Sequence, residues 1–441
     1  MIYKRARLAA TVAIIAGISF SSVSFGYPTI YPTGTTIYYP AKADGGYILV
    51  PEGYVGMNDP AYRAQEQMVD PGKWDYTLGY TGDRSQECRL IDMNGNVVHT
   101  WKVVPNYNVR SRLLDNGDLL QVDEEVNKEI LEYDWNGTIV WRYKTKGMPH
   151  HDVHRLPNGN TLVLVDEQVP AEQMQKVQDA ESPWWGVIKR KGIKLTGAAI
   201  YEITPGGETV WEWHAYERLD VRTFSPIDPN TDWTHANTIA PLPDNKWYDA
   251  GDRRFKPGNI LFSPRNLDKV VLVDKDTKKI VWEWTHTYKG GMAHQHEPQM
   301  IPKGFPGEGN ILLFDNGLFP RHRDHSGVSM VFEVNPVTKD IVWKYESSGH
   351  SSTKFFSKTR GSVLRLKNGN TFISEDNTGR IFQVSPAGEI VWEYVNRSDV
   401  SRAGQYPYDY TPQLRSMPKP KELQVTPPKN LEWHLKPDAL R

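Results

Sequence analysis

Short runs in which apolar and polar residues alternate recur along most of the chain, and six of them share one template. Each begins with an apolar strand, passes through a turn containing Gly, Asn, Asp or Pro, and ends in a second strand that carries a tryptophan. Alternation with a period of two on both sides of such a turn predicts a β-hairpin. The tryptophans that mark these six hairpins are Trp101, Trp141, Trp211, Trp282, Trp343 and Trp392.

A second type of hairpin precedes five of the tryptophan hairpins. It has a turn near Asn-Gly-Asn followed by an apolar run, as in HRLPNGNTLVLVDE and LRLKNGNTFISED. Two hairpins per repeat make four strands, and a series of four-stranded antiparallel units is typical of a β-propeller. We therefore expect an all-β protein, a six-bladed β-propeller with four-stranded antiparallel blades and a tryptophan on the outermost strand of each blade.

The repeats place the propeller at residues 76–397. Only part of the unit before the first tryptophan hairpin is recognisable, at Tyr76–Tyr80. Because circular closure of a propeller usually takes a strand from the other terminus, we expect the C-terminal segment, residues 398–441, to supply a closing strand. Residues 27–75 are left as an N-terminal segment.

The first residues have the composition of an export signal. Lys4, Arg5 and Arg7 precede an apolar run over residues 8–18, and small residues follow over 21–26. This order predicts a signal peptide at residues 1–26 and a periplasmic or secreted protein. An uncleaved anchor is the alternative, but the apolar run is short against the roughly 20 residues that span a bilayer. After cleavage we expect no membrane association.

The composition narrows the possible partners and bonds. The net charge of −1 over 441 residues gives no reason to expect nucleic acid or an anionic membrane as partner. Cys88 is the single cysteine, so no intramolecular disulfide can form.

Three histidines stand at a fixed distance from a proline. His296 lies six residues before Pro302, and the same offset recurs at His151 and His235. The first strand of a propeller blade lines the central channel, so we expect these channel histidines, His151, His235 and His296, to begin inner strands of three successive blades at one mouth of the channel. The spacing predicts three imidazoles at equivalent positions, facing one space.

Two further residues point to the same mouth. Asn237 lies two residues beyond His235 on the same strand face, and Arg265 ends an antiparallel strand that returns to the rim. Three imidazoles, an amide and a guanidinium together form a site for a small oxyanion. Long insertions join strands at this mouth, and the charged loop Arg321–His325 could steer an anion, although a solvated surface loop is the simpler interpretation.

At this point the motifs resemble a known family. HHDVHRLPNGNTLVL, DWTHAN followed by SPR, and AHQHEPQMIP with GNILLFDNG are similar to bacterial arylsulfate sulfotransferases of the type independent of 3′-phosphoadenylyl sulfate, over roughly residues 46–396. The resemblance implies that His296 attacks an aryl sulfate donor, forms a sulfohistidine and passes the sulfuryl group to a phenolic acceptor. It also implies that His151, His235, Asn237 and Arg265 hold the sulfuryl oxygens, with no cofactor and no metal.

Two other interpretations remain open. Three convergent neutral histidines are also a ligand set for zinc, iron or copper, which would make the protein a metal-dependent propeller enzyme. The other is a non-catalytic propeller scaffold that binds a peptide or glycan. A scaffold gives the three histidines no purpose, whereas a metal enzyme would lose its activity to a chelator.

Overall fold

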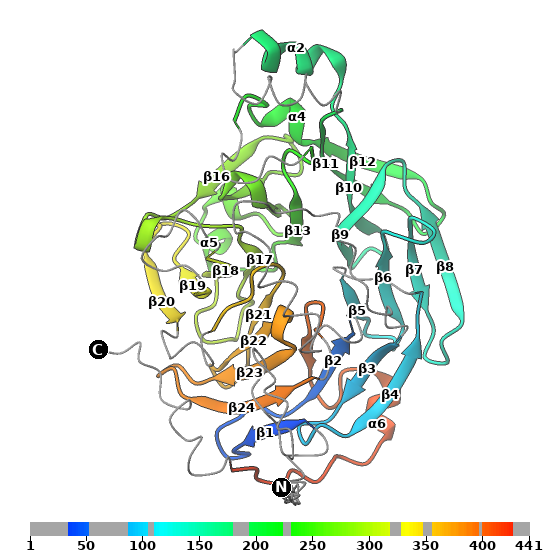
Figure 1. The fold of residues 1–441 in the computed structure, drawn as a ribbon, viewed down its shortest axis with the longest axis vertical. Coiled ribbons are helices and arrows are strands. Elements are labelled where there is room, and N and C mark those ends of the chain that lie inside the picture. The colour runs from blue at the N-terminus through cyan, green and yellow to red at the C-terminus, as the bar shows by residue number, and fades with distance from the viewer. Residues whose placement is uncertain are drawn as a thin grey trace, which may run out of the picture.

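The computed structural model describes residues 34–52, 87–104, 110–179, 194–223, 231–317, 328–346, 355–396 and 399–426. Within them the strands form six antiparallel sheets arranged in a ring, which confirms the six-bladed β-propeller (Figure 1). The expected signal peptide, Tyr76–Tyr80 and the Arg321–His325 loop lie outside the described residues.

The first three sheets, from the inner strand outward, follow the ring in chain order. The first contains β25 (Gly404–Tyr406), β2 (Tyr47–Pro51), β3 (Glu87–Ile91) and β4 (Val97–Lys102). The second contains β5 (Ser111–Leu113), β6 (Leu119–Asp123), β7 (Glu129–Tyr133) and β8 (Ile139–Lys144). The third contains β9 (Met148–Arg155), β10 (Thr161–Gln168), β11 (Thr196–Ile203) and β12 (Thr209–His214).

The other three sheets complete the ring. The fourth contains β13 (Ala236–Pro241), β14 (Ile260–Pro264), β15 (Val270–Val273) and β16 (Ile280–Trp284). The fifth contains β17 (His296–Met300), β18 (Ile311–Asp315), β19 (Met330–Val334) and β20 (Ile341–Glu346). The sixth contains β21 (Ser362–Arg365), β22 (Thr371–Glu375), β23 (Arg380–Val384), β24 (Ile390–Val395) and, beyond it, β1 (Thr35–Tyr38).

Helices are short and lie in the connections. The α-helices are α2 (Ala171–Asp179), α4 (Ala215–Arg218), α5 (Lys246–Asp249) and α6 (Pro412–Ser416). The 3-10 helices are η1 (Arg253–Phe255), η2 (Arg265–Leu267), η3 (Tyr288–Gly290) and η4 (Asp376–Thr378). Figure 1 shows α2 and α4 projecting beyond the ring next to the third sheet. Among the described residues, no helix has the length and apolar character needed to cross a bilayer.

Both ends of the described chain close the ring. β25 forms the inner edge of the first sheet beside β2, and β1 joins the outer edge of the sixth sheet beside β24. These strands lie outside the range 76–397 expected from the repeats, so the propeller extends in both directions. The repeat template could not reveal β1 and β2, because neither carries the marker tryptophan.

The marker tryptophans join each blade to the next. All six lie on the fourth strand of their sheet, but β1 makes Trp392 the one that is not on an outermost strand, which corrects that part of the prediction. Each indole N–H donates to a backbone carbonyl in the following blade at 2.7–3.1 Å. The acceptors, in the order of the tryptophans, are the carbonyls of Asp134, Pro205, Lys275, Pro336, Pro386 and Met93.

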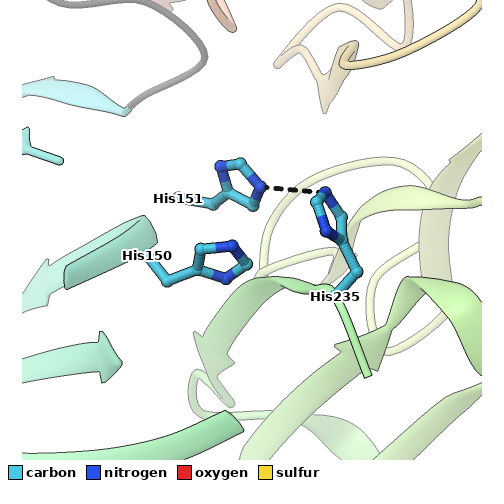
Figure 2. A group of neighbouring side chains, drawn as sticks. All are labelled: His150, His151 and His235. Carbon is cyan, nitrogen blue, oxygen red and sulfur yellow. Dashed lines mark hydrogen bonds between the residues drawn. The ribbon is translucent and has the colours of Figure 1, made fainter. Parts of the chain in front are cut away.

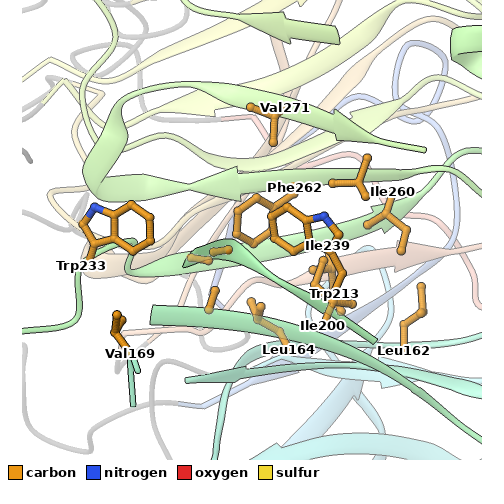
Figure 3. Packing of buried hydrophobic residues seen from close by; sticks show 14 of the residues in the cluster. Leu162, Leu164, Val169, Ile200, Trp213, Trp233, Ile239, Ile260, Phe262 and Val271 are labelled. Atoms are coloured by element: carbon orange, nitrogen blue, oxygen red, sulfur yellow. The ribbon is translucent and has the colours of Figure 1, made fainter. Parts of the chain in front are cut away.

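Apolar side chains fill the space between neighbouring blades. Figure 3 shows this packing between the third and fourth sheets, where Leu164, Ile200 and Trp213 meet Ile239 and Phe262. The rings of the tryptophan and the phenylalanine pack edge to face with centroids 5.0 Å apart. Burial of each such side chain stabilises the fold by about 1.5–3 kcal/mol, which fixes the inner strands that carry the channel residues.

Candidate active site

The inner strands share a backbone kink where they enter the channel. Five of them have a non-glycine residue with a positive φ. His151 (54°) lies at a bulge inside β9, whereas His235 (38°), His294 (56°), Arg360 (60°) and Arg402 (56°) lie one or two residues before their strands. Such a conformation is uncommon for residues with a Cβ and concentrates at functional sites. All five residues carry basic side chains.

A carboxylate holds four of these kinks in place. In each case the backbone N–H of the kinked residue donates to an acidic side chain, which for His235 comes from the same loop and for the other three from elsewhere in the chain. The pairs are His151 with Glu124, His235 with Asp232 at 2.9 Å, His294 with Asp268 at 2.9 Å, and Arg402 with Asp376 at 2.8 Å. These charge-assisted bonds stabilise the strained conformation.

His151 and His235 face each other at the channel (Figure 2), with their Nε2 atoms 3.3 Å apart. On the other side of each ring, Nδ1 contacts a carboxylate oxygen, 3.1 Å away on Glu124 for His151 and 2.8 Å away on Asp232 for His235. Because each Nδ1 lies against a carboxylate, the charge of that group favours a proton on this nitrogen. The two Nε2 atoms therefore face each other, and the pair can share one additional proton.

His150 packs against this pair but directs its nitrogens into the protein. Its Nδ1 donates to the carbonyl of Ala236 at 2.8 Å, and its Nε2 lies 3.3 Å from Asp232 Oδ2. Burial and the neighbouring charge of His151 lower the pKa of His150 to about 3. This ring is therefore uncharged at neutral pH and supports the His151–His235 pair by packing against it.

The ring of His296 is held in one tautomer. Its Nδ1 lies 2.6 Å from Asn316 Oδ1 and 2.9 Å from the carbonyl of His294. The Nδ2 of Asn316 donates to the carbonyls of Ser357 at 2.7 Å and Arg360 at 2.6 Å, so the side-chain oxygen must face the histidine. Both neighbours of Nδ1 are therefore acceptors, Nδ1 carries the proton, and Nε2 keeps its lone pair.

The environment of His296 also keeps the ring uncharged. Burial lowers the pKa of His296 well below its usual value, and the positive charges of Arg402 and Arg265 lower it further. The hydrogen bond with Asn316 acts in the opposite direction and is outweighed. A neutral imidazole with a free Nε2 lone pair, close to two guanidinium groups, can attack an electrophile whose charge those groups stabilise.

Arg265 is the first residue of the 3-10 helix η2, directly after β14. It follows Pro264, which pairs with Ala236 at the start of β13. Its side chain is buried, and its Nη1 donates to Asn266 Oδ1 at 2.7 Å. Its charge lowers the pKa of the channel histidines on both β9 and β17. The guanidinium therefore acts on the same space as these two rings.

Asn237 is completely buried and ties two blades together. Its Nδ2 donates to the carbonyl of Gln295 at 2.8 Å, and its Oδ1 accepts from the Thr238 hydroxyl at 3.0 Å. The Gln295 carbonyl directly precedes His296, so the amide fixes the loop from which the third channel histidine enters. One amide hydrogen of Asn237 remains for another acceptor.

The family model for arylsulfotransferase (ASST) matches residues 145–397, which is more than half of the chain. The chain belongs to the arylsulfotransferase family. The matched range contains all three channel histidines together with Asn237 and Arg265, but ends before Arg402. No curated protein sequence matches this arylsulfotransferase significantly.

Solved structures match this chain at low identity and low TM-score. A protein of unknown function from Bacteroides caccae is 13% identical, with a TM-score of 0.45 over 82% of this chain and 99% of that one. Virginiamycin B lyase from Staphylococcus aureus is 11% identical, with a TM-score of 0.39 over 72% and 79% of the two chains. These likenesses are too distant to carry an argument about function.

One expectation about the channel histidines of this arylsulfotransferase is wrong. The turns that end the three inner strands open at Leu156, Leu242 and Ile301, whose N–H groups bond to the carbonyl that closes each turn. His151 and His296 lie five residues before these positions, whereas His235 lies seven before. The six-residue distance from each histidine to a proline does not show equivalence, because Pro241 belongs to strand β13, while the other two prolines belong to turns.

Asn237 is therefore the equivalent of the other two channel histidines in the fourth blade, and His294 is the equivalent of His235 in the fifth. The rings of His151 and His235 still meet, and both residues adopt a positive φ, inside β9 for His151 and directly before β13 for His235. Backbone kinks, more than equal spacing, bring these two rings together.

Sequence reasoning missed four residues of the site, namely Glu124, Asp232, Asn316 and Arg402. Two of them lie in motifs that were noticed for other reasons: Asp232 in DWTHAN and Asn316 in the turn LFDNG. Glu124 and Arg402 come from blades that carry no channel histidine. For those two, the sequence offers no signal beyond a charged residue beside an apolar strand.

The arrangement also bears on the metal interpretation. The nitrogens of His150, His151 and His235 that could ligate all lie within 4.8 Å of one another. This trio differs from the expected set, because His150 takes the place of His296. A neutral imidazole whose other nitrogen binds a carboxylate is a usual metal ligand, so a tetrahedral cation fits two of these rings. The Nδ1 of His150, in contrast, is occupied by a backbone carbonyl.

Proposed function

We propose that this arylsulfotransferase moves a sulfuryl group from an aryl sulfate ester to a phenolic acceptor, in two steps, through a sulfohistidine on His296. One observation carries the proposal. The hydrogen bond between Nδ1 of His296 and Asn316 leaves Nε2 of a buried, neutral imidazole as the nucleophilic atom.

In the first step, Nε2 of His296 forms a bond to the sulfur of the aryl sulfate while the bond from sulfur to the aryl oxygen breaks. The electron pair of the broken bond leaves with the phenolate. Because a phenol has an ordinary pKa of about 10, the departing oxygen needs a proton. We assign that proton to the His151–His235 pair, whose Nε2 atoms lie 3.3 Å apart.

The sulfuryl oxygens need hydrogen-bond donors as charge shifts in the transition state, as in phosphoryl transfer. Arg265 supplies a guanidinium at the rim, and Asn237 supplies its remaining amide hydrogen. The protonated pair of His151 and His235 supplies a third donor. All of these groups are buried or nearly so, which strengthens their interaction with an anion.

In the second step, the acceptor phenol attacks the sulfur and the bond to Nε2 breaks. The phenol gives its proton back to the His151–His235 pair, which restores the starting state. The donor product leaves before the acceptor binds, so the kinetics are ping-pong.

The test is incubation with para-nitrophenyl sulfate, with and without a phenol, in the presence of a chelator. We expect transfer to the phenol under all chelator concentrations. With donor alone, rapid quenching and mass spectrometry should find about 80 Da added to the peptide that carries His296, as a covalent sulfuryl intermediate requires.

Two outcomes would overturn this proposal. Turnover that tracks bound metal and leaves no adduct would favour a metal enzyme using the His150, His151 and His235 trio, the second candidate that the geometry supports. Absence of any transfer, with retained binding of ligands at the channel, would favour a non-catalytic scaffold.

The N-terminal residues support a proposal about location. The basic start and short apolar run over residues 8–18 fit an export signal, so we propose that the mature enzyme acts in the periplasm or outside the cell. N-terminal sequencing of exported protein should find a start near Tyr27. A start at Met1 in a membrane fraction would contradict it.

A further inference from the structure

Arg402 reaches the channel from the strand that closes the ring. It lies two residues before β25, on the first blade, and beyond the range that matches the family model. Its side chain is 1% exposed, its φ is 56°, and its backbone N–H donates to Asp376 at 2.8 Å. The carbonyl of Arg402 accepts a hydrogen bond from Arg110 at 3.3 Å. The backbone is thus fixed from two sides, and the guanidinium enters the channel at a defined place.

Two donor atoms of the Arg402 guanidinium lack a hydrogen-bond acceptor in the part of the chain that the structure describes. Among the described residues, its Nε and Nη1 atoms are buried without a hydrogen-bond partner. The carboxylate of Glu297 comes within 3.9 Å of Nη1, but it already forms a closer ion pair with Arg110. A buried donor without an acceptor is costly, and such groups are rare unless a ligand satisfies them.

Arg360 on the sixth blade shows how protein groups bind both terminal nitrogens of an arginine at the corresponding kink. Its guanidinium donates to the carboxylate of Asp399 and, at 3.2 Å, to the carbonyl of Val400. It therefore holds the loop that leads to Arg402. The two arginines share a kinked backbone and deep burial, but Arg360 is engaged by the protein, whereas Arg402 keeps two donors for something else.

The position of Arg402 relates its free donors to the nucleophile. Glu297, the carboxylate nearest to Nη1, is the residue directly after His296. After burial, the charge of Arg402 is the largest influence that lowers the pKa of His296, and it also lowers that of His151. An anion bound beside these two rings would therefore lie next to the guanidinium.

We propose that Arg402 is a second guanidinium that binds the sulfuryl oxygens, delivered to the site by the C-terminal closing strand. This inference rests on the proposed function for its substrate. The binding of a tetrahedral oxyanion such as inorganic sulfate follows from the geometry alone. The proposal makes closure of the propeller a condition for activity, because Arg402 completes the anion site only when the C-terminal strand has closed the ring.

The test compares Arg402→Met and Arg402→Lys with wild type in two measurements. The first is the rise in melting temperature caused by inorganic sulfate, and the second is kcat/KM for para-nitrophenyl sulfate. Loss of one preorganised donor should lower kcat/KM by roughly 10²–10³-fold in Arg402→Met and remove most of the sulfate-dependent rise. Arg402→Lys should lose at least about tenfold, because lysine lacks the planar fork that binds two oxygens.

A matched control is available in Arg365, on the same kind of inner strand but paired with Glu333 at 2.6 Å. Arg365→Met should destabilise the fold and leave the sulfate response and kcat/KM unchanged. Guanidinium ion added at low concentration should restore part of the activity of Arg402→Ala, which a purely structural role of Arg402 would not allow.

The inference is wrong if folded Arg402→Met keeps the wild-type sulfate response and kcat/KM. If that variant does not fold, an unchanged inhibition constant for sulfate in Arg402→Lys has the same meaning. Failure of the proposed function looks different: wild type then transfers no sulfuryl group, while the sulfate response still depends on Arg402.

Discussion

The two halves of the channel rim share the positive-φ kink of the inner strands, but the kinked residues serve different purposes. On the third to fifth blades the kinked residues are His151, His235 and His294, and the Nδ1 atoms of the first two contact carboxylates while their Nε2 atoms face each other. On the sixth and first blades the kinked residues are Arg360 and Arg402, and the guanidinium of Arg360 pairs with the carboxylate of Asp399. One half presents nucleophilic or proton-carrying atoms, and the other half ties blades together.

Burial acts differently on the two kinds of side chain. Desolvation disfavours a charged form, and an imidazole gives up its charge easily because its ordinary pKa lies near neutrality. A guanidinium keeps its charge and must find a partner. The same buried environment therefore creates neutral nucleophiles on one side and ion pairs on the other. Arg402 departs from this division, because the nearest carboxylate to its Nη1 is 3.9 Å away and two of its donors have no acceptor among the described residues.

The largest effect should come from removing the nucleophile on the histidine side. His296→Asn keeps a side chain that can donate to Asn316 but has no ring nitrogen for sulfur. We expect transfer to fall by at least about 10⁴-fold, as for other enzymes that lose a covalent nucleophile. The measurement is release of para-nitrophenol under saturating phenol.

The control for this variant is His99→Asn, a ring stacked on Trp135 at the outside of the first blade with centroids 4.0 Å apart. It should keep full activity. Residual turnover of His296→Asn within a factor of ten of wild type would show that the chemistry does not depend on this half of the rim.

The next effect concerns the donors around the sulfuryl group. Arg265→Met or His235→Asn should each lower kcat/KM for the donor by roughly 10²–10³-fold, the cost of one preorganised donor. Both variants should still form the adduct on His296, only more slowly. Stopped-flow measurement of the first turnover separates this from loss of acceptor binding, and a wild-type rate of the first turnover would count against both assignments.

A smaller effect is expected from the residue that orients the nucleophile. Asn316→Leu removes the acceptor 2.6 Å from Nδ1 of His296, so the ring loses its fixed tautomer. Supporting residues of this kind typically contribute 10- to 100-fold, so we expect about that loss in the rate of sulfurylation. Asn316→Asp, which keeps an acceptor oxygen, should recover part of the rate. Equal rates in the two variants would mean that the tautomer is not what Asn316 controls.

Much of the fold could be predicted because its signals are local. A segment of about fifteen residues contains the whole signal for a hairpin with alternating apolar residues and a marker tryptophan, and six copies of it define six blades. The closing strands could not be predicted with the same certainty, because β1 and β25 pair with strands that are distant in sequence and carry no local signal of their own. Thr35, for example, pairs with Tyr394.

The candidate site was predictable only in part for the same reason. The channel histidines and Arg265 lie in motifs of their own, so the sequence reveals them one by one. Glu124, in contrast, lies 27 residues before the histidine that it holds, on another blade. Counting to a proline placed His235 incorrectly by two residues, since the true register depends on where each turn opens. Side-chain partners across blades require the three-dimensional arrangement.

The smallest effect tests whether the histidine half is also the acid-sensitive half. Burial lowers the pKa of His150 to about 3 from an ordinary value of 6.5. The unfolded chain therefore takes up a proton as the pH falls below about 6.5, while the folded protein does not. The stability that depends on this neutral ring is complete above that pH and is lost progressively toward pH 3. Between pH 7 and about 5.5, this one residue should lower the free energy of unfolding by about 1 kcal/mol.

His150→Gln keeps a donor for the Ala236 carbonyl but does not titrate, so its stability should fall less steeply with acid than that of wild type. Denaturant unfolding of both proteins at a series of pH values measures the difference, and parallel curves would show that the ring binds a proton equally well in the folded and the unfolded state.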